Sequence, residues 1–127
     1  MSYKYVVDAS AWFEYLYGTQ KGLKIKPLIE HKEIATSIVA VGELADKFAR
    51  TGHRFDILLQ FIQKRSALIE ISVPLLLAAA QFKKEIRNKR PKFGMADGVH
   101  LATTRQENSI LITADSDFSE LESVMLI

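Results

Sequence analysis

Short apolar runs alternate along the chain with longer segments whose apolar residues recur at helical spacing. The short runs predict strands at residues 3–7, 34–35, 68–71, 110–112 and 124–126. The longer segments predict helices at residues 11–17, 22–30, 38–50, 54–64 and 74–89, and a last helix that begins at Asp97. Strands that are separated by helices favour a parallel sheet with helices on both faces. We therefore expect an α/β protein that forms a single domain over residues 1–127.

Several polar, glycine and proline residues predict where these elements begin and end. Ser10 is a suitable N-cap for the first helix, and Gly18 is placed to end it. Thr36–Ser37 supplies an N-cap for the helix that follows the second strand. Pro74 suits the first turn of a long helix. Asn108 follows the last helix, and Asn tolerates the left-handed conformation that helix ends often need.

The composition excludes several kinds of protein. The chain lacks cysteine, which rules out disulfides and thiolate metal sites. Its apolar runs are far shorter than a membrane span, and the N-terminus lacks the apolar core of a signal peptide. We therefore expect a cytoplasmic protein with no membrane partner. A net charge of +2 alone says little about what it binds.

Acidic residues fall near the predicted ends of the central strands. Asp8 follows the first strand, and Glu43 lies in the helix after the second. Asp97 lies in the first turn of its helix, and Asp115 and Asp117 follow the fourth strand. Each acid alone is explained by a turn, a helix cap or an exposed charge. Jointly they indicate a site, because strands one and four are neighbours at the switch point of a doubly wound sheet.

Carboxylates that lie close together repel one another, and a hard divalent cation offsets that repulsion. Mg²⁺ and Mn²⁺ prefer carboxylate and water oxygens. Such an ion lowers the pKa of a water molecule and stabilises the charge on a phosphodiester under in-line attack. The acids therefore predict Mg²⁺ (or Mn²⁺) as cofactor, with no need for a histidine, cysteine or serine nucleophile.

Four segments carry a family resemblance: Val6–Ser10, Thr36–Leu44, Ala96–Ala102 and Ile110–Phe118. In this order they resemble the PIN-domain ribonucleases, most closely the small VapC-type toxins of toxin–antitoxin pairs. The resemblance covers the chain from end to end. It implies a sheet of strand order 3-2-1-4-5, metal-dependent cleavage of RNA, a homodimer, and an antitoxin chain that blocks the site.

The resemblance also assigns roles to particular residues. The acidic quartet that holds the metal and cleaves RNA would be Asp8, Glu43, Asp97 and Asp115. Asp117 would be an accessory acid, while Ser10 and Thr113 would hydrogen-bond to the acids or to metal-bound water. Because two acids follow the fourth strand, the fourth ligand could be Asp115, Asp117 or both. We favour Asp115, which is nearer the strand end and holds the family position.

Other residues have both a structural and a functional interpretation. A cluster of cations just before Asp97 predicts either RNA-phosphate contacts or a solvated helix end, and its candidate RNA-binding members are Lys84, Arg87, Arg90 and Lys92. We expect His100 to be a packed or half-buried helix residue rather than a metal ligand, because hard cations favour oxygen. Trp12, Phe13 and Tyr17 favour core or dimer contacts over base stacking. The apolar surfaces of the two N-terminal helices could accept an antitoxin segment.

Two other functions compete with the ribonuclease hypothesis. The first is a catalytically silent PIN-like domain that binds RNA or a protein as a scaffold, and the presence of all four acids counts against it. The second is a phospho-accepting receiver domain, which expects an acceptor aspartate after strand three. Ile71-Ser72-Val73 stands there instead. A nuclease is therefore the leading hypothesis.

Overall fold

The computed structural model of the protein describes residues 3–127. Their strands form one fully parallel sheet of order β3-β2-β1-β4-β5, which confirms the predicted topology. The strands are β1 Tyr5–Val7, β2 Ile34–Ser37, β3 Ala67–Ile69, β4 Ile110–Thr113 and β5 Val124–Leu126. Val7 of β1 pairs with Ile112 of β4, so the two strands end side by side. Residues that follow them meet at one edge of the sheet.

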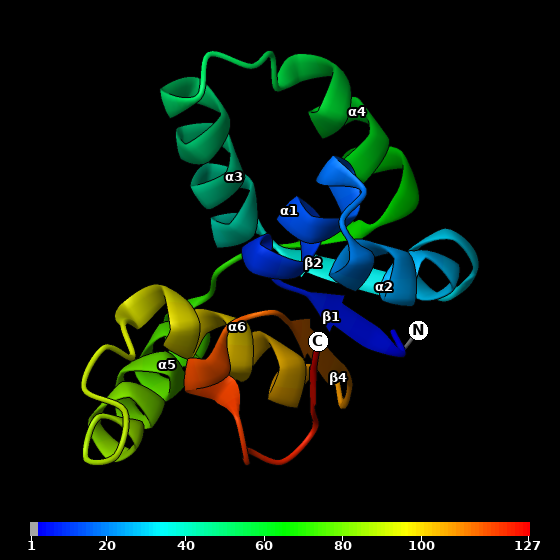
Figure 1. The fold of residues 1–127 in the computed structure, drawn as a ribbon. Helices are drawn as coiled ribbons and strands as arrows, with labels where there is room; N and C mark the ends of the chain where they lie inside the picture. Colours follow the sequence, from blue (N-terminus) through cyan, green and yellow to red (C-terminus); the bar gives the residue numbers. More distant parts are fainter. Residues whose placement is uncertain (1–2) are drawn as a thin grey trace.

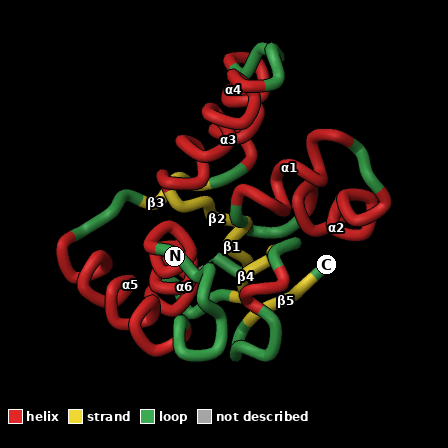
Figure 2. The backbone as a smooth tube through the Cα atoms, turned by 60° about the vertical axis from the view of Figure 1, so that its left-hand side comes forward, coloured by secondary structure: helices red, strands yellow, loops and turns green. Residues whose placement is uncertain are grey.

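Helices cover both faces of this sheet (Figures 1 and 2). One face carries α1 Ala9–Tyr17, α2 Gln20–His31, α3 Ile38–Arg50 and α4 Asp56–Arg65. The opposite face carries α5 Val73–Ile86 and α6 Met95–Gln106, and a 3₁₀ turn, η1 Ser116–Phe118, follows β4. Within residues 3–127, none of the helices is long and apolar enough to cross a membrane.

Successive side chains of β1 point to opposite faces of the sheet and contribute to a hydrophobic core on each face. Tyr5 and Val7 of β1 face the core under α1 to α4, whereas Val6 faces the core under α6. All three side chains are buried, as expected of a strand covered on both faces. The helices are therefore anchored to the sheet from both sides, and their N-terminal turns are held close to the strand ends.

Helix α6 packs unusually close to α5. A Cβ atom added to Gly98 would lie 2.4 Å from the backbone oxygen of Ala79, closer than any real contact. Leu75 and Ala79 of α5 pack there against Val99 and Ala102 of α6. Gly98 is the residue after Asp97, so this contact also sets the position of Asp97.

Most element bounds agree with the sequence to within a few residues. Helix α3 and strand β5 have the predicted bounds, and Gly18 and Asn108 have the expected positive φ values of 65° and 51°. The sequence placed the start of β1 two residues early, ended β2 two residues early, and extended α5 to 89, three residues past its end at Ile86. Helix α4 begins at Asp56 rather than Arg54, and α2 runs from Gln20 to His31.

One predicted cap was wrong. Asp8, not Ser10, is the N-cap of α1, so the helix begins at Ala9. The Asp8 carboxylate accepts a hydrogen bond from the backbone N–H of Ala11, and Ser10 lies within the first turn. The Ser10 hydroxyl is therefore available for contacts across the sheet edge.

Candidate active site

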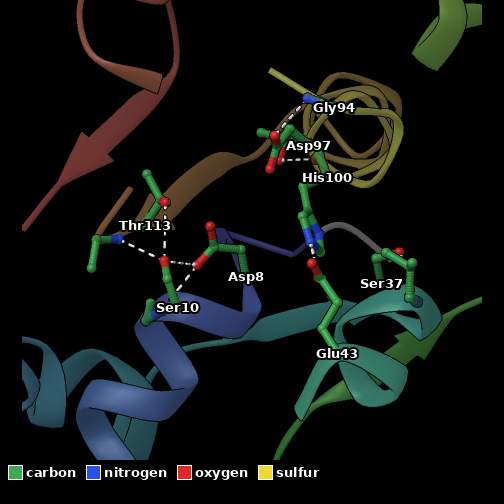
Figure 3. Close-up of polar contacts among 12 residues, drawn as sticks. Asp8, Ser10, Ser37, Glu43, Gly94, Asp97, His100 and Thr113 are labelled. Atoms are coloured by element: carbon green, nitrogen blue, oxygen red, sulfur yellow. Dashed lines mark hydrogen bonds and ion pairs between the residues drawn. The ribbon is translucent and has the colours of Figure 1, made fainter. Parts of the chain in front are cut away.

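Asp8 lies where β1 ends and α1 begins (Figure 3). It is 3% exposed, and its Oδ1 accepts hydrogen bonds from the Ala11 N–H at 2.9 Å and from the Ser10 hydroxyl at 2.7 Å. Burial raises the pKa of Asp8 above the ordinary value of 3.8, and the nearby charge of His100 opposes that rise. A buried carboxylate of this kind favours a bound proton or a neighbouring cation.

A short hydroxyl network joins Asp8 to the end of β4. The Ser10 hydroxyl lies 3.2 Å from the Thr113 hydroxyl and accepts a hydrogen bond from the Ala114 N–H at 2.9 Å. The Thr113 hydroxyl accepts one from the Asp115 N–H at 3.0 Å. The sequence predicted that Ser10 and Thr113 would hydrogen-bond to the acids or to metal-bound water. The Ser10 hydroxyl donates to Asp8, and the Thr113 hydroxyl accepts from the backbone of Asp115. Hydrogen bonding by Thr113 also acts to lower the pKa of Asp8.

The two acids after β4 have different positions. The Asp115 carboxylate accepts a hydrogen bond from the Asp117 N–H at 2.9 Å and caps η1. Asp117 lies within that turn and contributes its backbone N–H to the contact. Asp115 therefore lies nearer the strand end, and its charge reaches Asp97.

Asp97 lies in the first turn of α6, on the opposite side of the cluster. Its Oδ2 accepts a hydrogen bond from the Gly94 N–H at 2.8 Å, which closes the start of the helix. Burial raises the pKa of Asp97, the charges of Asp115 and Glu43 raise it further, and the Gly94 hydrogen bond and His100 act against them. A carboxyl group whose pKa is raised by the charges of neighbouring acids is the electrostatic signature expected of a shared site.

Glu43 projects from α3 toward the same region, where it contacts His100 of α6 (Figure 3). The His100 Nε2 atom lies 2.7 Å from Glu43 Oε1. Burial of the imidazole disfavours its charged form. The hydrogen bond to Glu43 and the charges of Asp8, Glu43 and Asp97 outweigh that effect and raise the pKa of His100 above 6.5. The structure confirms that His100 is buried, but its contact with Glu43 was not foreseen.

These side chains fit a hard divalent cation by the chemistry of their oxygen donors. Among residues 3–127, no three His, Asp or Glu side chains are grouped closely enough to hold one ion together. Mg²⁺ is commonly held by one or two carboxylates, with waters and substrate phosphates completing its shell. Asp8 and Asp97, with their raised pKa values, are the acids that would gain most from a cation. Asp115 and Glu43 supply further carboxylate oxygens beside Asp97.

The basic residues lie in two places. Arg87 donates to the Phe93 carbonyl at 2.7 Å and Arg90 donates to the Ser119 hydroxyl at 2.7 Å, so both arginines also brace loops. A second pair was not singled out from the sequence. Lys47 and Arg50 of α3 line a groove of about 280 Å³ together with Ser10 and Glu43. Their spacing from Glu43, four and seven residues on, could have identified them as one helix face.

The fold and the acids together define a parallel α/β domain with an acidic site at the carboxyl ends of its central strands. A parallel α/β sheet with acids beyond the carboxyl ends of its neighbouring central strands has its candidate site where open sheets place ligands. Within that class, the chain belongs to the PIN domain family, which matches residues 5–124. This confirms the family resemblance. No curated protein matches the chain.

Solved structures of toxin–antitoxin proteins are similar in fold. A chain of a toxin–antitoxin complex from Klebsiella pneumoniae superposes with a TM-score of 0.75 at 17% identity, over 96% of each chain. VapC20 of Mycobacterium tuberculosis, described as a sarcin-ricin loop cleaving toxin, gives 0.71 at 18% identity, covering 94% of this chain and 95% of that one. A chain of VapBC2 of Rickettsia felis, bound to a promoter DNA fragment, superposes with a TM-score of 0.69 at 16% identity. The match covers 97% of this chain and 96% of that one. At these identities the similarity establishes the fold.

Proposed function

We propose that this protein is a metal-dependent endoribonuclease and the toxin of a type II toxin–antitoxin pair. The observation that carries the proposal is the convergence of acids from separate elements of a PIN domain: Asp8 at the start of α1, Asp97 in the first turn of α6 and Glu43 of α3 gather around His100 (Figure 3). Asp8 reaches the same cluster through Ser10 and Thr113. The fold similarity to VapC-type toxins supports the toxin role.

The quartet proposed to act on RNA is Asp8, Glu43, Asp97 and Asp115. Mg²⁺ or Mn²⁺ held by these carboxylates would lower the pKa of a water molecule and offset the charge of the phosphodiester. Hydrolysis adds that water across one ester: its oxygen bonds to phosphorus, one P–O ester bond breaks, and the departing oxygen takes up a proton. Among the described residues, Glu43 Oε2 accepts no hydrogen bond, so it is free to hold the cation or orient the water.

Supporting residues keep the acids in place. Ser10 and Thr113 hold the strand ends together, and Asp117 orients Asp115 through its N–H. We propose RNA-phosphate contacts at Lys84, Arg87, Arg90 and Lys92. The groove beside Glu43 adds Lys47 and Arg50 as nearer candidates.

Two apolar surfaces support the proposed protein partners. A groove of about 330 Å³ is lined by Tyr15, Leu23 and Phe61 of α1, α2 and α4, and we propose that an antitoxin segment binds there. Val73 and Leu77 of α5 are 70% and 68% exposed, and we propose this face for a homodimer. Because RNA and a co-expressed antitoxin meet in the cytoplasm, we propose that the protein acts there.

The testing experiment is cleavage of a pool of transfer RNA and unstructured RNA by the purified protein, with Mn²⁺ or Mg²⁺ and with EDTA. The variants are Asp8→Asn and Asp97→Asn, with Asp56→Asn as the matched control. Asp56 is an exposed acid in the first turn of α4, where it pairs with Arg54, and it does not line the groove beside Glu43.

We expect the wild type and Asp56→Asn to cut RNA, EDTA to stop them, and both site variants to be folded but inactive. Equal cleavage by all proteins would mean contamination and would contradict the proposal. A folded wild type that binds RNA without ever cutting it would favour the catalytically silent scaffold instead.

A further inference from the structure

His100 occupies a position that core packing alone does not explain. Helix α6 is buried from Gly98 to Thr104, and the His100 side chain is 3% exposed. Its Nδ1 atom has no hydrogen-bond partner among the described residues. An unpartnered polar atom in a buried helix costs stability that an aliphatic side chain would not. The presence of a histidine here therefore points to a role for its other nitrogen.

The other ring nitrogen, Nε2, makes a contact between two helices. His100 Nε2 lies 2.7 Å from Oε1 of Glu43, which belongs to α3, 57 residues away in the sequence. The Glu43 side chain is 40% exposed and has three rotatable bonds, so without a partner it would sample several rotamers. The imidazole has little freedom because it is buried on a packed helix. The contact therefore restricts the mobile partner.

The contact also leaves half of the glutamate available. It uses Oε1 only, and among residues 3–127 Oε2 accepts no hydrogen bond. Asp8 and Asp97 lie close enough to the imidazole to interact with its charge, so the restricted carboxylate is held beside the rest of the cluster (Figure 3). In metal sites, partners of this kind orient the ligating side chains.

We propose that His100 is a positioning residue that fixes Glu43 with one carboxylate oxygen free beside Asp8 and Asp97, ready for a divalent cation or the attacking water. This inference rests on the proposed metal-dependent function. It assigns to His100 no direct contact with the cation.

The test compares two amides of different reach. In His100→Gln the side-chain N–H can approach Glu43, whereas in His100→Asn it is too short. The matched control is Thr103→Val, because Thr103 lies one turn further along α6, is 1% exposed, and also has an unpartnered buried polar atom. Each protein is titrated with Mn²⁺ by calorimetry, and kcat and KM are measured on RNA.

We expect His100→Asn to weaken Mn²⁺ binding by about tenfold and to lower kcat with KM little changed, the size typical of lost outer-shell contacts. His100→Gln should recover most of the Mn²⁺ affinity and most of kcat, and Thr103→Val should match the wild type. In a Glu43→Gln background, adding His100→Asn should change little more, because both act through one carboxylate. If His100→Asn does not fold, His100→Leu suits the apolar surroundings and replaces it in the series.

Other outcomes separate the two claims. If His100→Asn binds Mn²⁺ like the wild type, or more tightly because the imidazole competes with the ion, the positioning role is wrong and the proposed function stands. If the wild type binds Mn²⁺ but cuts no RNA, the proposed function fails and the Mn²⁺ affinities still decide the role of His100. If the wild type binds no Mn²⁺, both fail.

Discussion

The two sides of the acid cluster are built differently. On the strand side, Asp8 follows β1 directly and Asp115 lies two residues after β4, and hydrogen bonds through Ser10 and Thr113 tie the two strand ends together. On the helix side, Glu43 and Asp97 project from α3 and α6. There the polar link between the helices, among the described residues, is the contact from His100 to Glu43.

This difference separates a fixed half of the site from an adjustable one. Side chains next to strand ends inherit the geometry of the sheet, because backbone pairing sets their positions. The half-exposed Glu43 depends on the packing of α6 and on a single histidine. We therefore expect the acids of both sides to be needed for cleavage, and the packing of the helix side to set its rate.

The largest expected effect is that of Asp8→Asn on activity. Loss of this buried carboxylate should remove several kcal/mol of transition-state stabilisation and so lower kcat by about 10³-fold. The same variant should be more stable than the wild type without metal, because burial already disfavours the charged form of Asp8. The Asn Oδ1 atom can still accept from Ala11 and Ser10, so the cap survives.

The measurement is thermal unfolding with and without Mn²⁺, alongside RNA cleavage. Mn²⁺ should raise the Tm of the wild type and leave that of Asp8→Asn unchanged. A variant that is both inactive and less stable would show that Asp8 acts mainly as a helix cap.

Next in size is the loss of the hydroxyl bridge in Ser10→Ala. The Ala114 N–H loses its acceptor and Asp8 loses one donor, so unfolding should become easier by about 1–3 kcal/mol. Cleavage should fall about 10–100-fold, as for other outer-shell contacts. Urea denaturation and kcat measure the two effects. If Ser10→Ala instead behaves like wild type, the strand side is not held in place by this hydroxyl.

The sequence predicted the fold more fully than it predicted these contacts. Alternating apolar runs gave the strands, and the order of family segments gave the topology that the sheet adopts. The errors fell at element ends. Asp8 and Ser10 are both good caps, and the choice between them depends on Thr113, which is distant in sequence and offers the serine a partner.

The candidate site was predictable as a set of residue types, not as a geometry. Asp8, Glu43, Asp97 and Asp115 could be selected because each follows a recognisable element. The contact between His100 and Glu43 could not be, because it depends on the rotation of α6 that the Gly98 contact with α5 imposes. The position of His100 between the apolar residues Val99 and Leu101 was the available signal.

A smaller effect is expected from a methyl group placed between α5 and α6. Gly98→Ala puts a Cβ 2.4 Å from the Ala79 carbonyl oxygen, so α6 must shift, at a cost of about 1–3 kcal/mol. Activity should fall with stability because Asp97 and His100 move with the helix. Gly42→Ala in α3 is the control. Its added Cβ meets nothing within 4 Å, so the variant should raise the free energy of unfolding by about 1 kcal/mol.

Denaturation curves and kcat of these two glycine variants test whether the helix side is adjustable. Full activity in a destabilised Gly98→Ala would mean that Asp97 tolerates a helix shift, and that the helix side is looser than proposed.

The smallest expected effect is the pH dependence of stability without metal. Asp8, Asp97 and His100 all have raised pKa values, so the folded protein binds protons more tightly than the unfolded chain does. The stability these groups contribute is fully present below their ordinary values of 3.8 and 6.5, and it is lost as pH rises through the raised ones. Each unit of raised pKa is worth about 1.4 kcal/mol for the buried Asp8 and His100. It is worth less for the partly exposed Asp97 because of solvent screening.

Urea denaturation from acidic to mildly alkaline pH, with and without Mn²⁺, measures this dependence. The metal-free protein should lose stability as pH rises. Added Mn²⁺ should increase the free energy of unfolding most at the highest pH, because the ion binds deprotonated carboxylates. The two sides then separate by variant: Asp8→Asn removes the part of the loss that begins above pH 3.8, and His100→Asn removes the part that begins above 6.5. If neither variant changes the curve, the two sides are not electrostatically distinct, and differences in their rigidity alone must explain how they act.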